Sequence, residues 1–329
     1  MTGPVYVCGA EPGDLLEVRI LDLTPRPSGN PIYEGKAFGS NAGAWWGFHY
    51  NNLSEDPSPR EVITIYAIET DGETSWAEAV HRYRWVPQAT PDGEMHERID
   101  YPGIIVDQDQ VVQLDETLEG VKLPLRLHIG AMGVAPSEAD IVDSIPPSYF
   151  GGNIDDRHVG IGTSMYYPVA VPGALFSAGD AHASQGDSEL NGTAIETSMT
   201  GVFQFVLHKQ ADLEGSILAG VDYPLLETPD SWIVHGFTFP NYLAELGEDA
   251  QTEIYELSSI DPALKDSSTK MRNFLMNGMN ISEDEAYSLI TVGTDFAITQ
   301  VVDGNWGVHG IVSKQLFPEG TSKTRPHGS

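Results

Sequence analysis

The sequence has a single cysteine, Cys8, so no disulfide can form within the chain and nothing marks an oxidised, secreted protein. It also has no apolar run close to the ~20 residues that a membrane-spanning helix needs. The chain does not open with a basic region followed by an apolar stretch, so no signal peptide is expected. These absences predict a cytoplasmic protein.

Basic residues are scarce. There are 17 Lys and Arg against 48 Asp and Glu, which gives a net charge of −31 at pH 7. Because phosphate binding needs clustered Lys and Arg, this charge argues against nucleic acid and anionic membranes as partners. Two interpretations of the acidic surface remain open. The first is an ordinary acidic enzyme. The second is a surface that keeps the protein hydrated in concentrated salt, where screening over roughly 3 Å at 1 M removes the repulsion.

Common catalytic motifs are missing as well. The chain contains no Gly-x-Ser-x-Gly turn, no Gly-x-x-x-x-Gly-Lys and no Gly-x-Gly-x-x-Gly between a strand and a helix. The sequence therefore gives no support for a serine hydrolase of the elbow type or for a nucleotide-binding loop.

The chain is rich in turn-forming residues, since 22 prolines and 34 glycines are spread along its whole length. That distribution is typical of many short strands joined by turns. Helical periodicity appears only late, over 242–257, 262–279 and 283–291, with a strand at 296–302. Ser282 and Glu285 have the spacing of a capping box for the third helix.

We therefore predict a mainly β protein: a β-sandwich plus a second β-barrel-like unit, with a C-terminal α+β module. The predicted boundaries are 1–120 for the sandwich-like part, 121–240 for the second unit with the site motifs, 241–318 for the module and 319–329 for a disordered tail.

An acidic segment over residues 172–196 concentrates groups that can bind a metal or move a proton. It contains no Lys or Arg, so its carboxylates need a cation or a shared proton. On an extended chain, residues two apart share a face, which would bring Asp180 beside His182 and Asp187 beside Glu189. The remaining candidates of this segment are Gln185 and Glu196.

Two glycine-rich stretches carry further candidates. His128 ends an apolar strand and is either a metal ligand or a histidine satisfied in the core. In Gly151-Gly152-Asn153-Ile-Asp155, the polar side chains either line a pocket or form an Asx turn beside a solvated pair of aspartates.

Taken in order, four motifs make the chain resemble the acetamidase/formamidase family over about residues 3–318. They are Gly-Ala-Glu-Pro-Gly-Asp at 9–14, His-x-Gly-x-x-Gly-Val-Ala-Pro at 128–136, Gly-Gly-Asn-x-Asp at 151–155 and Gly-Ala-Leu-Phe-Ser-x-Gly-Asp-x-His-Ala-x-Gln-Gly-Asp-x-Glu at 173–189. The resemblance implies a hydrolase that cleaves short aliphatic amides, of the formamide or acetamide type, to a carboxylate and ammonia. It also implies a homo-oligomer and a divalent metal, for which we favour zinc over calcium.

On this interpretation the metal ligands are expected to be His128, Asp180 and His182. Glu189 or Glu196 would carry the proton from water to the departing nitrogen. The expected contacts to the amide oxygen come from Asn153 and the backbone amides of Gly151 and Gly152. The other substrate-binding candidates are Asp155, Gln185 and Asp187.

Two alternatives stay open. Family members carry residues ahead of the strand near Gly3, so the chain could instead be a non-catalytic, metal-stabilised binding or assembly protein. A loop with Trp45 and Trp46 either anchors the core or shapes the entrance for a larger or cyclic substrate.

Overall fold

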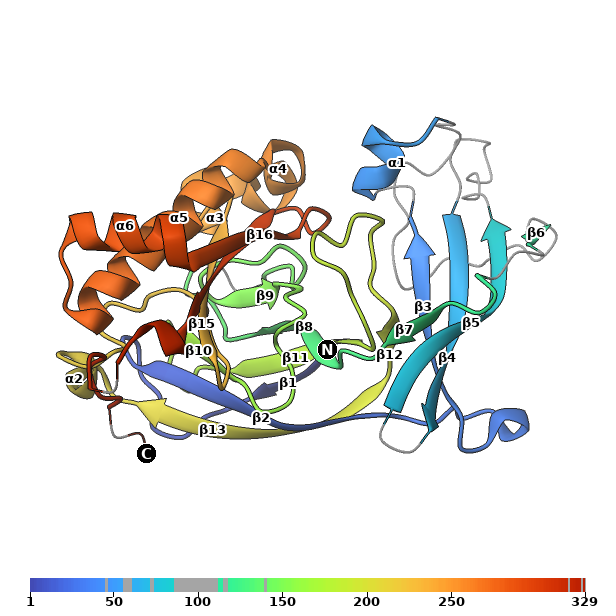
Figure 1. Ribbon diagram of the computed structural model, residues 1–329, viewed down its shortest axis with the longest axis horizontal. Helices are drawn as coiled ribbons and strands as arrows, with labels where there is room; N and C mark the ends of the chain where they lie inside the picture. Colours follow the sequence, from blue (N-terminus) through green and yellow to red (C-terminus); the bar gives the residue numbers. More distant parts are fainter. Residues whose placement is uncertain are drawn as a thin grey trace. The chain divides into compact units, whose positions relative to one another are not determined.

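The structure is a computed structural model that describes residues 1–44, 47–55, 61–71, 74–85, 112–114, 118–138, 141–318, 320–326 and 328. The described chain is mainly β, as the sequence predicts (Figure 1). None of its described helices is long and apolar enough to cross a membrane. Trp45 and Trp46 lie outside the described residues.

The chain folds into two compact units that are each discontinuous in sequence. Unit 1 comprises Met1–Thr24, Leu127–Ala181 and Thr200–Ser329, and unit 2 comprises Pro25–Arg126 and His182–Met199. The contiguous domains expected over 1–120, 121–240 and 241–318 stay a prediction. The two compact units follow from strand pairing between distant segments, which composition does not record.

Unit 1 contains a seven-stranded sheet. Its order is β13 (Met199–His208), β2 (Leu15–Pro25), β10 (Ser164–Pro168), β14 (Leu225–Glu227), β15 (Ser231–Phe237), β17 (Gly307–Ser313) and β16 (Thr294–Gln300). The pairings from β2 through β16 are antiparallel. Among the described strands this sheet is open, with β13 and β16 at its edges. The expected barrel-like closure is therefore not found.

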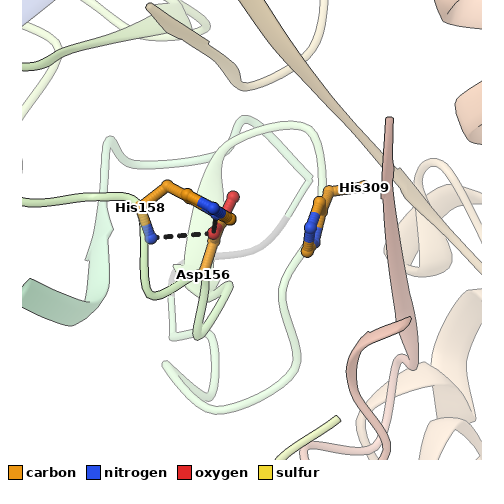
Figure 2. A group of neighbouring side chains, drawn as sticks. All are labelled: Asp156, His158 and His309. Carbon is orange, nitrogen blue, oxygen red and sulfur yellow. Dashed lines mark hydrogen bonds and ion pairs between the residues drawn. The ribbon is translucent and has the colours of Figure 1, made fainter. Parts of the chain in front are cut away.

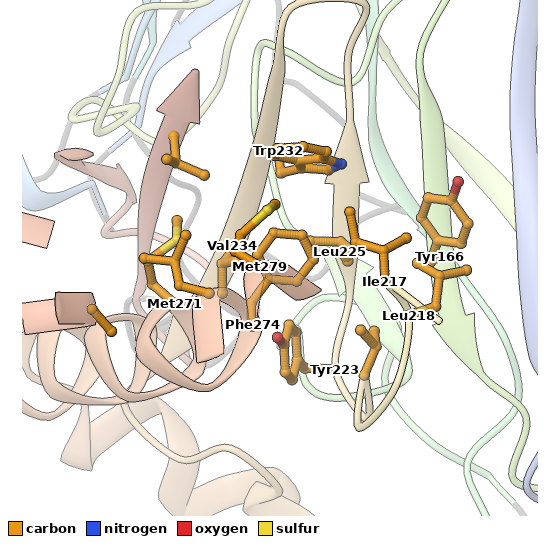
Figure 3. Packing of buried hydrophobic residues seen from close by; sticks show 14 of the residues in the cluster. Tyr166, Ile217, Leu218, Tyr223, Leu225, Trp232, Val234, Met271, Phe274 and Met279 are labelled. Atoms are coloured by element: carbon orange, nitrogen blue, oxygen red, sulfur yellow. The ribbon is translucent and has the colours of Figure 1, made fainter. Parts of the chain in front are cut away.

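A long helix packs on this sheet. Phe274 of α5 (Ile260–Met279) contacts Trp232 of β15 with ring centroids 5.6 Å apart, within a buried apolar cluster that Figure 3 shows. The helix approaches β15 so closely at Gly236 that a Cβ there would lie 2.1 Å from the backbone nitrogen of Ser267. Glycine is therefore required at this crossing.

The other helices follow the sequence prediction, with one difference. The capping box of Ser282 and Glu285 opens α6 (Glu283–Gly293), as predicted. The single helix expected over 242–257 is divided into α3 (Tyr242–Leu246) and α4 (Ala250–Leu257). The break comes at Gly247, whose φ of +72° ends an α-helix. A short helix, α2 (Gln210–Leu213), precedes them.

Four further strands of unit 1 carry or adjoin the motifs: β1 (Thr2–Val5), β8 (His128–Gly133), β9 (Gly151–Asn153) and β11 (Phe176–His182). β8 pairs with β9, and β1 pairs with β11.

The C-terminal tail, for which the sequence predicts disorder, makes backbone hydrogen bonds from Lys323 N to Gly278 O and from Ile217 N to Thr324 O.

Unit 2 is built on a second antiparallel arrangement of strands. In order these are β6 (Val112–Gln113), β5 (Thr74–Trp85), β4 (Glu61–Asp71), β3 (Ala37–Gly43) and β12 (Glu196–Thr197), while β7 (Lys122–Pro124) pairs with β5. One short helix, α1 (Phe48–Asn52), follows β3. Glu196 of β12 pairs with Ser40 on one side and with His182 on the other, so the sheet register itself places the histidine opposite the glutamate.

Candidate functional site

Three of the predicted site carboxylates have an unusual backbone. Asp155, Asp180 and Glu189 have φ values of 51°, 56° and 47°, in the left-handed region. Such a conformation costs of order 1–3 kcal/mol for a residue other than glycine, and it persists where the surrounding structure imposes it, often at functional sites. The strain supports a functional role for these three positions.

The backbone at these positions differs from the extended chain that the sequence interpretation assumed. Extended alternation was expected to put Asp180 beside His182 and Asp187 beside Glu189. Asp180 is left-handed, and residues 187–189 form a turn in which Ser188 is left-handed too. Alternation along an extended strand is therefore not what orients these side chains, and the roles of both pairs stay predictions.

In unit 2, His182 lies between two polar partners. Its Nδ1 is 2.9 Å from the side-chain oxygen of Gln185, and its Nε2 is 3.2 Å from Oε2 of Glu196. If Nδ1–H donates to the Gln185 oxygen, the neutral ring turns the Nε2 lone pair toward a carboxylate. In that tautomer a proton or a metal ion is needed between the two atoms, whereas in the other tautomer Nε2–H donates to the carboxylate. The imidazole of this pair is buried, since His182 is 1% exposed.

The same segment lines a cavity of about 530 Å³ in unit 2. Gln185, Asp187 and Glu189 all contribute to its wall, and Glu189 is buried whereas Asp187 is exposed. Asn41 of β3 also lines the cavity, and its amide donates to the carbonyl oxygens of Thr193 (2.7 Å) and Ala194 (3.0 Å). The cavity therefore has both polar and apolar groups in its wall and a volume suited to a small ligand.

In unit 1, the structure brings two of the predicted motifs together. The backbone nitrogens of Ile154 and Asp155 both donate to the carbonyl oxygen of Gly130, which belongs to the His128 motif. Gly151 is needed in this arrangement, since its φ is +103° and a Cβ would lie 2.3 Å from the carbonyl oxygen of Met132. His128 is fully buried at the start of β8. Its meeting with Asp180 and His182 around one ion stays a prediction.

A third constellation, in unit 1, was not predicted. Asp156 is 1% exposed and accepts from Nδ1 of His158 at 2.6 Å and from Nε2 of His235 at 2.8 Å. His309 lies beside this group, as Figure 2 shows, and its ring centroid is 5.4 Å from that of His158. The alternative interpretation of Asp155 and Asp156 as a solvated pair is wrong, because the two residues are 2% and 1% exposed. The Asp-x-His spacing at 156–158 was the available signal.

The electrostatics of this group keep the carboxylate ionised. Burial on its own would raise the pKa of Asp156. The charge of His309 and the hydrogen bond from His158 outweigh burial, so the pKa of Asp156 lies well below its ordinary value. The group therefore combines a buried anion with neighbouring imidazoles.

Comparison with known proteins gives a consistent result. A model of the Acetamidase/Formamidase family matches residues 1–144 and 139–313. The chain is 32% identical over 213 residues to an acetamidase of Mycolicibacterium smegmatis, covering 58% of this chain and 48% of that protein. It is 27% identical over 210 residues to a formamidase of Methylophilus methylotrophus, covering 58% and 46%. The chain thus spans about half the length of the curated relatives it matches.

Solved structures share the fold. The crystal structure of an acetamidase from Bacillus halodurans superposes with a TM-score of 0.65 at 22% identity, covering 95% of this chain and 78% of that one. An acetamidase from Yersinia enterocolitica gives a TM-score of 0.64 at 23% identity, covering 96% and 74%. At identities of 22% and 23%, these comparisons show a shared fold and no more.

Proposed function

Because the chain belongs to the acetamidase/formamidase family, we propose that it hydrolyses short aliphatic amides, of the formamide or acetamide type, to a carboxylate and ammonia. The relatives named above are an acetamidase and a formamidase. The observation that carries the proposal is the pair of His182 and Glu196, a buried imidazole and a carboxylate 3.2 Å apart in the segment that lines the unit 2 cavity.

The proposal includes a divalent metal, with His128, Asp180 and His182 as ligands. The approach of His182 Nε2 to Oε2 of Glu196 at 3.2 Å supports the presence of a cation there. Two imidazoles among three ligands favour zinc over calcium, because calcium prefers oxygen ligands. When bound, such an ion supplies a water molecule with a pKa lowered toward about 7.

The residues of this chain then move the proton. Glu189 or Glu196 accepts the proton from the attacking water and delivers it to the amide nitrogen, which departs as ammonia. Glu196 is well placed for this because its other oxygen, Oε1, accepts from the backbone nitrogen of Ala194 at 2.9 Å, which fixes the carboxylate.

The remaining candidates hold the substrate. Asn153 and the backbone amides of Gly151 and Gly152 stabilise the amide oxygen as it becomes negative. The others orient the amide group, and they are Asp155, Gln185 and Asp187. We further propose that the enzyme works as a homo-oligomer in the cytoplasm, without nucleic acid or membrane partners.

The test is an ammonia-release screen with formamide, acetamide, propionamide and larger or cyclic amides. We expect turnover of the shortest linear amides and a strong decrease with acyl length. Glu248→Gln, an exposed carboxylate in unit 1, is the control that should leave turnover unchanged. Good folding without ammonia from any of these amides would contradict the proposal and favour a non-catalytic binding protein.

A further inference from the structure

We propose that Asp156, His158 and His309 form a binding site for a divalent transition-metal ion, with zinc as the best match. The site lies within unit 1 and shares no residue with the ligands proposed for amide hydrolysis. One carboxylate oxygen and one nitrogen from each imidazole lie within 4.8 Å of one another. The inference stands on this geometry and does not depend on the proposed reaction.

The donor types match zinc. Two imidazole nitrogens and one carboxylate oxygen are a common three-ligand set for this ion, with bonds of about 2.0–2.2 Å. Ligand atoms around a tetrahedral ion at that distance are about 3.4 Å apart. The three groups therefore need only small side-chain adjustments to meet at one ion. Calcium and magnesium are poor matches because they select oxygen ligands.

The short contact inside the group shows where the ion would bind. His158 Nδ1 lies 2.6 Å from Oδ1 of Asp156. Each oxygen of Asp156 thus lies within hydrogen-bond distance of an imidazole nitrogen, Oδ1 near His158 and Oδ2 near His235. A metal ion would take the place of the contact between His158 and Oδ1 and would bind the unprotonated nitrogen of the ring.

Contacts outside the three ligands orient them. His235 donates from Nε2 to Oδ2 of Asp156 at 2.8 Å and so leaves Oδ1 on the side of His158. The hydroxyl of Thr299 lies 2.9 Å from Nδ1 of His309, which makes Nε2 the ligand atom of that ring. Such outer contacts fix ring orientation and are a usual feature of metal sites.

The fold holds the ligands on fixed elements and leaves a way in. His309 lies in the middle of β17, directly opposite His235 of β15, so both imidazoles belong to adjacent strands of one sheet. Asp156 and His309 are each 1% exposed, whereas the His158 side chain is 23% exposed. An ion can therefore reach the site past His158 and be bound in buried surroundings.

The experiment measures metal content in a His182→Gln background, which removes a ligand of the other proposed site. Chelator-treated protein is dialysed against zinc, desalted and analysed for zinc per chain. We expect about one equivalent in His182→Gln, and its loss when His158→Gln or His309→Gln is added. The control is His182→Gln with His81→Gln, because His81 is an exposed histidine in unit 2.

Two outcomes overturn the proposal. The first is zinc content unchanged by His158→Gln and His309→Gln in variants whose circular dichroism and thermal melts match those of the parent. If those variants do not fold, X-ray absorption of zinc in the folded His182→Gln protein decides. Two imidazole ligands support the site, and a spectrum without imidazole, or no retained zinc, excludes it. The experiment does not measure ammonia release, so a negative result for this zinc site does not contradict the proposed amidase activity.

Discussion

Glu17 of β2 accepts a hydrogen bond from Nε2 of His208 of β13 at 2.9 Å, across two strands that are almost 200 residues apart in the chain. The same carboxylate accepts from Nε of Arg19 at 2.6 Å, and it is fully buried. Burial would raise its pKa, but the hydrogen bonds from His208 and Arg19 lower the pKa to about 2.

This network predicts a defined acid sensitivity. Because the folded-state pKa of Glu17 lies below the ordinary value, its contribution is complete above about pH 4.5 and is lost as the pH falls toward 2. The loss should be of order 3 kcal/mol in the free energy of unfolding. Urea unfolding at several acidic pH values should give a steeper decline for the wild type than for Glu17→Gln. An identical slope in both proteins would refute the prediction, and the exposed Glu214→Gln is the control.

Glu61 should show the opposite dependence. It is fully buried on β4, and among the described residues neither carboxylate oxygen has a hydrogen-bond partner. Burial raises the pKa of Glu61 to about 7. Since the folded state holds the proton more tightly than the unfolded state, stability is greatest below about pH 4.5 and declines as the pH rises to 7.

Glu61→Gln should therefore stabilise the protein above pH ~7 by up to a few kcal/mol relative to the wild type. It should also flatten the stability profile between about pH 4.5 and pH 7. Thermal melts across this range are the measurement, with Glu69→Gln on the same strand as control. Equal profiles for wild type and Glu61→Gln would show that the carboxyl has solvent or a partner when folded.

The proposed proton carriers give a catalytic prediction. Glu196→Gln keeps the side-chain shape and an oxygen acceptor for the backbone nitrogen of Ala194, but it removes the negative charge beside His182. We expect kcat for the best amide to fall by roughly 10²–10⁴-fold in Glu196→Gln or in Glu189→Gln. Steady-state ammonia release is the assay. Near wild-type rates in both variants would place the chemistry elsewhere.

Metal removal tests a separate part of the proposal. Treatment with chelator, followed by elemental analysis that verifies the loss of metal, should abolish ammonia release. Zinc should restore it better than calcium, because imidazole ligands favour zinc. Full activity of verified metal-free protein would eliminate the metal role while leaving the family assignment intact.

The packing of α5 on β15 gives a prediction about stability. Phe274→Ala removes a ring that is 2% exposed and contacts Trp232, so it should cost about 3–5 kcal/mol. Gly236→Ala should be destabilising as well, since its Cβ would overlap the backbone of Ser267. Chemical unfolding measures both. The control is Leu264→Ala, because Leu264 is an exposed position of the same helix and should change stability little.

Local signals in the sequence were sufficient for the late helices. The capping box at Ser282 depends on residues three apart, so it could be recognised without knowledge of the fold. The single helix expected over 242–257 failed at Gly247, where apolar periodicity continues on both sides of a residue with positive φ. Periodicity does not detect such a break.

Local sequence patterns were also insufficient for the candidate site, because part of it is assembled from distant segments. Crowding of polar groups drew attention to the segment that contains His182, Gln185 and Glu196, and the structure brings these three side chains together. The cluster around Asp156 was missed because His235 and His309 come from strands that are distant in sequence. Only the register of β15 against β17 brings those two residues together. No local pattern encodes that register.

The pairing of β2 with β10 also bears on synthesis of the protein. β2 ends at Pro25, but its neighbour β10 begins only at Ser164, and the segment between them builds most of unit 2. During translation β2 therefore cannot pair with β10 until more than a hundred further residues have been synthesised. Exposed strand edges of this kind promote association between nascent chains. The order of the strands therefore sets how long an unpaired edge is exposed during synthesis, independently of the stability of the finished fold.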